Sequence, residues 1–352
     1  MKISSFVPLL LILSIWACTK DNEPVREEPN AGQNPVYLDA NGITVKAYDW
    51  AEAGDTGEVN GQVYTVADDG LLRGMVSKGA DLTYVCTSKV TNMIGLFMYS
   101  APKGDLTSWD VSRVTNMNRM FYGQPFNQPI GYWDVGLVTD MGYMFATSLF
   151  NQPLGDWDVH NVKVMDFMFS ETPFDQDISR WDVSQVQSMV AMFHRSAFNQ
   201  PIGSWDVSRV NSMSWMFSAT PFNQPIGGWD VSSVTDMSGM LRASPFNQDI
   251  SSWNVSHVSD MSGMFEGGRS DLIGNANQTG ITVFNQDISS WDVSNVFNMS
   301  RMFANSMFNQ DLSAWDVTNV YYCCNFDADA SGWSASRPHF RNCTFDGCGG
   351  PF

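Results

Sequence analysis

Tryptophan recurs every 24 residues through most of this 352-residue chain. The interval holds from Trp109 to Trp253 and again from Trp291 to Trp315, whereas the step from Trp253 to Trp291 is 38 residues. A fixed period of this length is typical of a solenoid, in which each repeat forms one coil stacked on the next. The long step contains a Gly- and Asn-rich stretch, residues 266–283, which we expect to form a loop bulging from one coil.

Each repeat combines two kinds of apolar spacing. Residues 130–135 have the spacing L-x-x-L-x-L, and the alternation of Trp133, Asp134 and Val135 predicts a short strand. In residues 138–145 the apolar side chains lie at i, i+3, i+6 and i+7, which predicts about two turns of helix with one buried face. One unit cannot bury both apolar edges alone, so stacking should place the strands in a parallel sheet on one face and the helices on the other.

Stacking would align equivalent residues of successive repeats into columns. The columns that begin at Phe126 and Met117 should pack inside the solenoid, where flexible Met fills gaps left by Trp and Phe. The column that begins at Asn127 should hydrogen-bond to backbone groups of neighbouring turns.

Composition excludes one class of partner and favours others. The formal net charge of −18 would repel phosphate backbones, so we expect no nucleic-acid partner. The same charge favours solubility and an attraction for cations or basic partners.

The N-terminus has the features of a targeting segment. Residues 1–17 combine Lys2 with an apolar run too short to span a membrane comfortably, and Ala17-Cys18 resembles a bacterial lipobox. This resemblance implies cleavage before Cys18 and a lipid anchor on that residue, with an ordinary secretory signal as the alternative. Residues 18–35 are polar and rich in Pro, Asn and Glu, and they should form a flexible tether.

Four of the other cysteines lie close to the C-terminus. They are Cys323, Cys324, Cys343 and Cys348. In an exported protein such a cluster predicts disulfides, whose connectivity the sequence leaves open, and Cys86 would remain as the odd thiol. Zinc is the weaker interpretation because adjacent cysteines lack the usual ligand spacing.

No catalytic constellation or cofactor motif is present in the sequence, and we expect a non-catalytic protein with no assigned metal. The residue after each Trp is almost always aspartate, which predicts an outward-facing Asp ladder. Its members are Asp110, Asp134, Asp158, Asp182, Asp206, Asp230, Asp292 and Asp316. Local Ser hydroxyls and backbone amides could offset the repulsion between neighbouring carboxylates. The alternative is an array that binds Ca²⁺ or a repetitive glycan, although no calcium-loop pattern is present.

The position before each Trp varies from repeat to repeat. Most coils carry a small residue there, but Tyr132, Asp156 and Arg180 form one chemically distinct patch. Variation at an exposed position is what a selective binding surface requires, so this patch is the candidate partner site.

Units such as FNQDISSWDVSNVFNMSRMF resemble the tandem repeats of BspA-like surface proteins, which belong with the leucine-rich-repeat proteins of bacteria and mycoplasmas. The resemblance implies an α/β repeat fold, a right-handed leucine-rich-repeat-like solenoid with adhesive or interaction roles. We expect an N-terminal β/α cap over 36–85, the repeats over 86–322 and a Cys-rich cap over 323–352.

The expected protein is a monomer, lipid-anchored in the bacterial cell envelope at the outer membrane and exposed at the surface. Its expected partner is a protein or glycan on a host or neighbouring cell. A structural spacer that only sets length and rigidity is the competing interpretation.

Overall fold

The computed structural model describes residues 32–268 and 282–343. The chain divides into two compact units, Met1–Gln33 and Asn34–Phe352. The predicted signal peptide, Cys18 and most of the predicted tether therefore lie outside the described residues. The helix and the strands all belong to the second unit.

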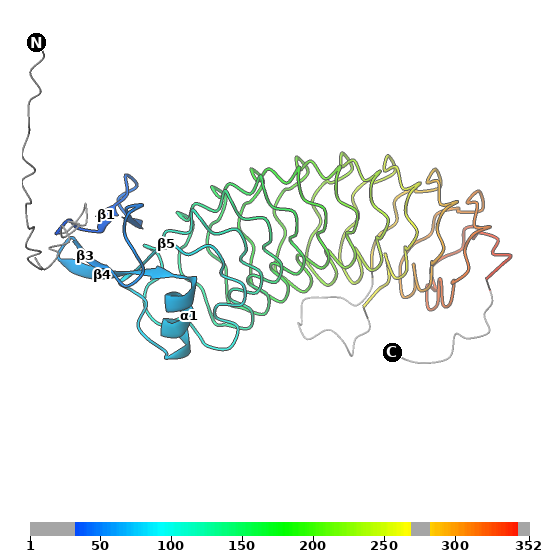
Figure 1. The fold of residues 1–352 in the computed structure, drawn as a ribbon. Coiled ribbons are helices and arrows are strands. Elements are labelled where there is room, and N and C mark those ends of the chain that lie inside the picture. Colours follow the sequence, from blue (N-terminus) through cyan, green and yellow to red (C-terminus); the bar gives the residue numbers. More distant parts are fainter. Residues whose placement is uncertain (1–31, 269–281, 344–352) are drawn as a thin grey trace, which may run out of the picture. The chain divides into compact units, whose positions relative to one another are not determined.

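The second unit begins with five short strands and one helix (Figure 1). They are β1 (Val36–Leu38), β2 (Val45–Ala47), β3 (Thr56–Val59), β4 (Gln62–Asp68), α1 (Asp69–Ser77) and β5 (Val85–Lys89). Strands β1 and β2 pair antiparallel, as do β3 and β4, whereas β5 runs parallel to β4 after the α1 crossover.

Local sequence explains two of these elements. Asn60 and Gly61 both have positive φ, at 51° and 78°, as the tight β3–β4 hairpin requires. Helix α1 begins after Asp68, whose side chain accepts the backbone N–H of Leu71 at 2.8 Å and so caps the helix. The β3–β4 hairpin and helix α1 therefore each follow from the residues at their ends.

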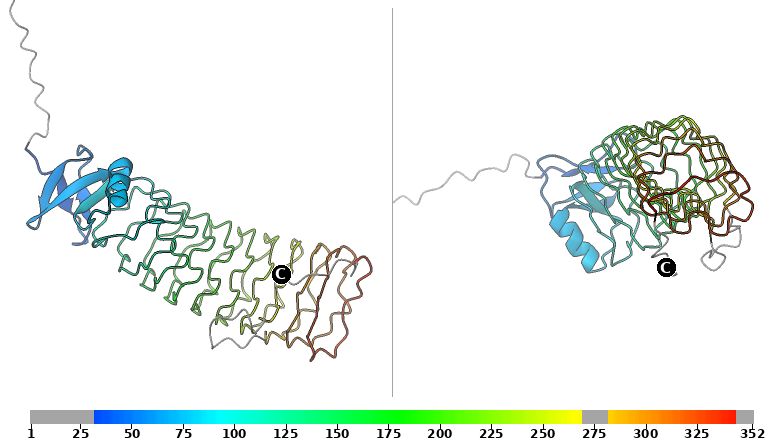
Figure 2. Two further views of the ribbon diagram at one scale, coloured as in Figure 1. Left: turned by 90° about the horizontal axis from the view of Figure 1, so that it is seen from below. Right: turned by 90° about the vertical axis from the view of Figure 1, so that its right-hand side faces the viewer.

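Beyond β5 the chain forms coils that lie side by side, one repeat to a coil (Figures 1 and 2). Parallel β-bridges join equivalent residues of adjacent coils, as in Asn116↔Asp140 and Ser188↔Ser212. These partners are 24 residues apart, so the sequence period equals one turn of the coil. The stacking of repeats is thus visible in the backbone pairing itself.

The aromatic columns pack inside the coils. The Trp109 and Trp133 indoles stack at 6.3 Å between centroids with an interplanar angle of 5°, and Phe174 and Phe198 stack at 6.2 Å. The first column methionine, Met117, has no exposed surface, and one continuous hydrophobic cluster runs from Ala67 to Trp333. Aromatic stacking adds to the stability that the burial of this apolar area already provides.

The Asn column holds neighbouring coils together, as predicted. The Asn127 carboxamide oxygen accepts the backbone N–H of Asn151 at 2.9 Å and the side-chain amide of Gln152 at 3.2 Å. Asp175, which replaces Asn once in the column, accepts the Asn199 N–H at 2.9 Å. Asp serves as well as Asn because the column needs an acceptor oxygen.

The predicted helix over 138–145 is wrong. In its place are successive β-turns, closed by bonds such as Met144 N–H to the Met141 carbonyl at 3.1 Å. Tyr143 has φ of 57° and Thr147 has φ of 56°, and such left-handed residues cannot continue a right-handed helix. The Tyr143 N–H points outward from the turn to the carbonyl of Asp166 in the next coil, at 2.7 Å. Among the described repeat residues no α-helix is present.

The predicted strand over 133–135 is also wrong as a regular strand. Turns close on both sides of it, with Trp133 N–H bonded to the Ile130 carbonyl at 3.1 Å and Val138 N–H to the Val135 carbonyl at 2.9 Å. The β-bridges between the described coils are isolated and parallel, and all except Thr282↔Ser306 fall at Asp140 and its equivalents. Trp133 and Val135 are therefore buried and Asp134 is exposed, although no regular strand pairing joins these residues to the neighbouring coils.

The long step between Trp253 and Trp291 leaves the stacking intact. Asp260 bridges to Asn298, 38 residues later, as its equivalents bridge over 24. The Thr282 hydroxyl donates to the Glu266 carbonyl at 3.0 Å and closes the base of the inserted segment. Of the predicted loop over 266–283, residues 269–281 lie outside the described residues.

A disulfide joins Cys323 to Cys343, with 5.9 Å between the two Cα atoms. Cys323 occupies a buried Met position, so this bond fastens the C-terminal segment to the last coil. Cys324 is disulfide-bonded as well, and Cys348 lies in the part of the chain that is not described. Cys86 is a free, buried thiol, as the odd cysteine count indicated.

Candidate interaction surface

Each aspartate of the ladder accepts a hydrogen bond from the residue two positions later. The Asp206 carboxylate accepts the backbone N–H of Ser208 at 3.0 Å, and Asp230 accepts that of Ser232 at 3.0 Å. Asn254, the exception in the ladder, accepts the Ser256 N–H in the same way at 3.2 Å. The ladder therefore stabilises the turn after each Trp, which is the local role that the sequence offered as one interpretation.

Hydrogen bonding outweighs repulsion along the ladder. The hydroxyl and N–H of Ser232 hold the pKa of Asp230 below its usual value, even though the charge of Asp206 acts to raise it. The pKa of Asp292 is lowered in the same way by Ser294, against the charge of Asp316. Asp230 and Asp292 are therefore ionised at neutral pH, and each commits one oxygen to its own turn.

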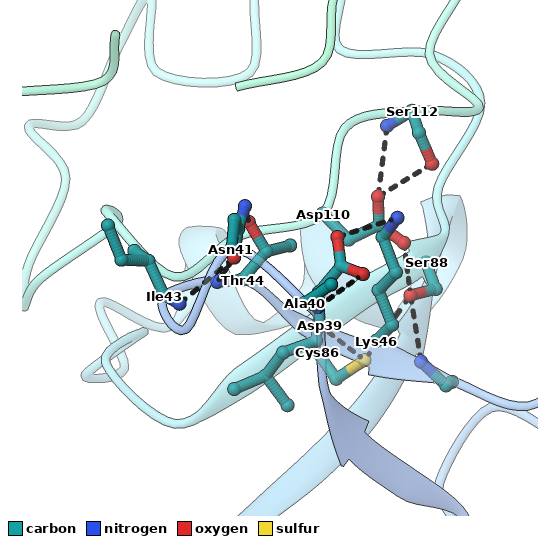
Figure 3. Close-up of polar contacts among 12 residues, drawn as sticks. Asp39, Ala40, Asn41, Ile43, Thr44, Lys46, Cys86, Ser88, Asp110 and Ser112 are labelled. Atoms are coloured by element: carbon teal, nitrogen blue, oxygen red, sulfur yellow. Dashed lines mark hydrogen bonds and ion pairs between the residues drawn. The ribbon is translucent and has the colours of Figure 1, made fainter. Parts of the chain in front are cut away.

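The first member of the ladder, Asp110, is buried beneath the N-terminal strands (Figure 3). Its carboxylate accepts the Ser88 hydroxyl at 2.5 Å and the Ser112 hydroxyl at 2.7 Å. Ser88 in turn accepts the backbone N–H of Ala47 on β2 at 2.9 Å. The exposed ladder consequently begins at Asp134.

Lys46 provides positive charge near this buried carboxylate and pairs with Asp39 at 3.0 Å. Burial acts to lower the pKa of Lys46, but the hydrogen bond to Asp39 and the charge of Asp110 outweigh it and raise the pKa overall. Close by, the Cys86 thiol donates to the Val45 carbonyl at 3.4 Å, and burial raises its pKa (Figure 3). This thiol therefore remains protonated and packs as a small apolar group.

Two of the three residues in the predicted partner patch form an ion pair in the structure. An Arg180 guanidinium nitrogen lies 3.3 Å from an Asp156 carboxylate oxygen, and the two side chains are 78% and 83% exposed. Tyr132, which is 62% exposed, occupies the same position one coil earlier. An exposed ion pair contributes little to stability, so these side chains are available to a partner.

The third residue of each Met-x-x-Met turn also varies and was missed by the sequence interpretation. Tyr143, Phe167 and Trp215 occupy this position with φ between 56° and 59°. They lie at the outside of turns that had been predicted as helix, where their exposure was not expected. The glycines at 239 and 263, in the same position of later repeats, are the signal that could have indicated a left-handed backbone.

Two of the histidines lie in different surroundings. His160 pairs with Asp158 at 2.7 Å on the surface, whereas burial, followed by the charge of Arg195, lowers the pKa of His194 to about 4. Within residues 32–268 and 282–343, no group of three or more His, Cys, Asp or Glu is placed to hold a metal ion.

A family model described as Mycoplasma protein of unknown function, DUF285, matches the chain over residues 91–197, 172–273 and 273–348. Together these matches span most of the chain and all of its complete coils. The chain belongs to the DUF285 family. Several coils fall within each DUF285 match, which agrees with a protein built from tandem repeats.

Membership in the DUF285 family assigns no activity, since the family is described as having unknown function. No curated protein and no solved structure matches the chain. None of the helices that the structure describes has the length and apolar character needed to span a membrane.

Proposed function

We propose that this protein is a cell-surface lipoprotein whose coils form a non-catalytic interaction or adhesion module. In this proposal Cys18 carries the lipid that anchors the chain to the outer membrane, and residues up to 35 act as the tether. The coils would be a right-handed solenoid of the leucine-rich-repeat type, as in BspA-like proteins. The partner would be a protein or glycan on another cell surface.

One observation supports binding in particular. Interior positions repeat almost without change, while the exposed position before each Trp carries Tyr132, Asp156 and Arg180 in three successive coils. Only the exposed residues are free to vary without loss of packing, and the Asp156–Arg180 pair is open to solvent on both sides. Tyr and Arg are also the side chains most often found at the energetic centre of interfaces.

Binding of the fluorescently labelled full chain to epithelial and bacterial cells, followed by flow cytometry, tests this proposal. The double variant Tyr132→Ala/Arg180→Gln should bind at least tenfold more weakly, and Ser204→Ala, at the same position of another coil, should bind as the wild type does. Equal binding by the double variant would exclude this patch. If the wild-type chain binds neither kind of cell, the adhesion function is wrong and the spacer function is favoured.

The lipid anchor is tested separately. Cells grown with an alkyne-bearing fatty acid should label the wild-type protein and not the Cys18→Ser variant. Labelling of both proteins, or of neither, would contradict acylation at Cys18.

A Ca²⁺ or glycan array on the Asp ladder has weaker support. Ladder carboxylates such as Asp206 and Asp230 already accept hydrogen bonds from their own turns, which reduces the number of oxygens available to a cation. We therefore expect millimolar Ca²⁺ to leave the thermal unfolding midpoint unchanged.

A further inference from the structure

Three aromatic side chains form an exposed cluster on the last two coils. The Phe297 and Tyr321 rings stack at 5.6 Å with an interplanar angle of 4°, and the Tyr322 ring meets both of them edge-on at 5.0 Å. The three side chains are 47%, 51% and 48% exposed. We name these residues the terminal aromatic cluster.

Earlier coils carry mostly polar side chains at the same two positions. Thr139 and Asp140 occupy them in one coil, and Gln187 and Ser188 occupy them in another. Aromatic residues appear at these positions only where the stack of coils ends. A contiguous exposed apolar patch usually marks a contact surface, so the cluster calls for an occupant at the C-terminal end of the stack.

The described chain continues past the last complete coil in the register of a further coil. In three coils an Asn side-chain amide donates to a carbonyl of the preceding coil at 2.7 Å, as Asn319 does to Ser294. Asn342 makes the same bond to Thr318, again at 2.7 Å, and Thr318 is the equivalent of Ser294. Asn342 therefore occupies the Asn319 position of a further, incomplete coil.

This register determines which residue comes next to the cluster. Tyr322 follows Asn319 by three residues, and Phe345 follows Asn342 by three residues. Residues 344–352 lie outside the described part of the chain. Equivalent residues of adjacent coils form parallel bridges at the Tyr322 position, so a continued register brings Phe345 against Tyr322.

The cysteines fix the start of this segment against the last coil. Cys343, directly after Asn342, is bonded to Cys323, with 5.9 Å between the two Cα atoms. Cys324 is the next residue after Cys323, and its sulfur is also in a disulfide. Because consecutive Cα atoms are about 3.8 Å apart, the Cα atom of Cys324 lies within about 10 Å of that of Cys343.

Chain length selects Cys348 as the partner of Cys324. Cys86 is a free thiol, and Cys18 belongs to the other compact unit. Cys348 follows Cys343 by five residues, which span up to about 17 Å and are long enough to return to Cys324. Closing this short loop also costs less entropy than a bond across most of the chain.

From these observations we propose that residues 344–352 continue the incomplete coil and that Phe345 covers the terminal aromatic cluster. A disulfide between Cys324 and Cys348 holds the segment in place. Its formation removes two electrons and two protons from the two thiols, and a disulfide-bearing oxidant accepts them. The cluster is then a docking site for the C-terminus of the same chain, which covers a last unit that has no neighbouring coil. The proposal requires neither a lipid anchor nor an adhesion partner.

Alkylation of the full chain without reductant, followed by peptide mass spectrometry with fragmentation, tests the disulfide. The reaction is run in mildly acidic denaturant, where thiol–disulfide exchange is slow. The wild type should carry label on Cys86 and none on Cys324 or Cys348. Cys348→Ser should add label on Cys324, and the matched variant Cys343→Ser should add it on Cys323 instead. Label on Cys348 in the wild type, or an unlabelled Cys324 in Cys348→Ser, would overturn the pairing.

Hydroxyl-radical footprinting of the oxidised full chain tests the occupant. Tyr132, which is 62% exposed, provides a reference on a different surface of the same molecule. In the wild type, Tyr321 and Tyr322 should react at least about threefold more slowly than Tyr132. Phe345→Ser should remove this protection and leave the rate of Tyr132 unchanged. Phe352→Ser, which removes a ring from the same segment at a position beyond the cluster, should leave all three rates unchanged.

Two results would overturn the docking of the C-terminal segment. One is a wild-type protein whose Tyr321 and Tyr322 react as fast as Tyr132. The other is protection that survives Phe345→Ser, and if this protection also grows with protein concentration, the occupant is a second copy of the chain.

Discussion

The Trp181 indole N–H donates a hydrogen bond to the backbone carbonyl of Leu154 in the preceding coil, at 2.9 Å. The same bond recurs between Trp205 and Ile178 at 3.2 Å, and even across the insertion between Trp291 and Ile250. Each tryptophan is therefore both a stacked ring and a link between coils. A buried indole N–H needs such an acceptor, and Phe in this column would pack its ring but lose this link between coils.

Trp181→Phe should lower stability beyond the loss of apolar area. The substitution removes one of the two hydrogen bonds that the Leu154 carbonyl accepts, since the Trp157 N–H still donates to it at 3.0 Å, and the expected cost is about 0.5–1.5 kcal/mol. Urea unfolding followed by circular dichroism would measure this loss. Phe174→Leu serves as the comparison, because it changes a stacked ring in the same region without removing a hydrogen bond. If Trp181→Phe lowers the free energy of unfolding by no more than Phe174→Leu does, the result would argue against the role of the bond.

The adjacent glycines at 227 and 228 should respond differently to alanine. A Cβ on Gly227 would lie 2.4 Å from the backbone carbonyl oxygen of Asp249 in the next coil, whereas a Cβ on Gly228 would meet nothing within 4 Å. Gly227→Ala should therefore destabilise the protein by about 1–3 kcal/mol, the usual range for overpacking. Gly228→Ala should be nearly neutral, and similar unfolding midpoints for both variants would contradict the close stacking of these coils.

Glycine should stabilise the protein at a left-handed position that carries no ring. Ala243 has φ of 52°, so Ala243→Gly should raise stability by up to about 1 kcal/mol. Ala197 is exposed and its φ is not positive, so Ala197→Gly should lower stability by about 0.5–1 kcal/mol. Differential scanning fluorimetry would show midpoints moving in opposite directions, and a decrease for both variants would contradict the left-handed backbone.

The Asp ladder should make stability depend on pH in the acidic range. The pKa of Asp230 is lower in the folded protein than its ordinary value of 3.8, because the Ser232 hydroxyl and N–H favour the carboxylate. The stability that the Asp230 carboxylate contributes is therefore fully present above the ordinary pKa of aspartate. It is lost as the pH falls through the lower pKa that Asp230 has in the folded protein. Asp230→Asn keeps the acceptor oxygen, as Asn254 does naturally, and should reduce the fall in midpoint between pH 5 and pH 3.

Asp230→Ala serves as the control for this prediction. It removes the acceptor and should lower the midpoint at pH 7 as well, where Asp230→Asn should not. Identical acid profiles for the wild type and Asp230→Asn would show that Asp230 does not contribute to the pH dependence.

Column positions could be predicted from the sequence because a constant period assigns each residue a neighbour 24 positions away. The stacking of Trp109 on Trp133 and the acceptor role of Asn127 both follow from this rule. So does the contact between Asp156 and Arg180, which differ by one period.

The path of the backbone inside each coil could not be predicted in the same way. Apolar residues at i, i+3, i+6 and i+7 fit a helix, yet they fit equally well a chain of β-turns that directs these same side chains into the core. The choice depends on where the backbone N–H groups go, and at Tyr143 the acceptor is a carbonyl of the next coil. That long-range bond outweighs the low preference of tyrosine for a left-handed backbone. No feature of the sequence near Tyr143 indicates that this bond forms. The outward positions of Tyr143, Phe167 and Trp215 were missed for this reason.

Engineered disulfides offer the most direct measurement of the stacking on which this account depends. Ser204, Gly228 and Ser252 are exposed at the same position of three successive coils, so neighbours should lie within the Cα separation of 4.4–6.8 Å that a disulfide needs, and coils two apart should not. The Ser204→Cys/Gly228→Cys protein should therefore form an intramolecular disulfide under mild oxidation, detected by mass spectrometry of its peptides, while Ser204→Cys/Ser252→Cys should retain two free thiols. Equal cross-linking of both pairs, or cross-linking of the distant pair alone, would contradict the stacking of consecutive repeats.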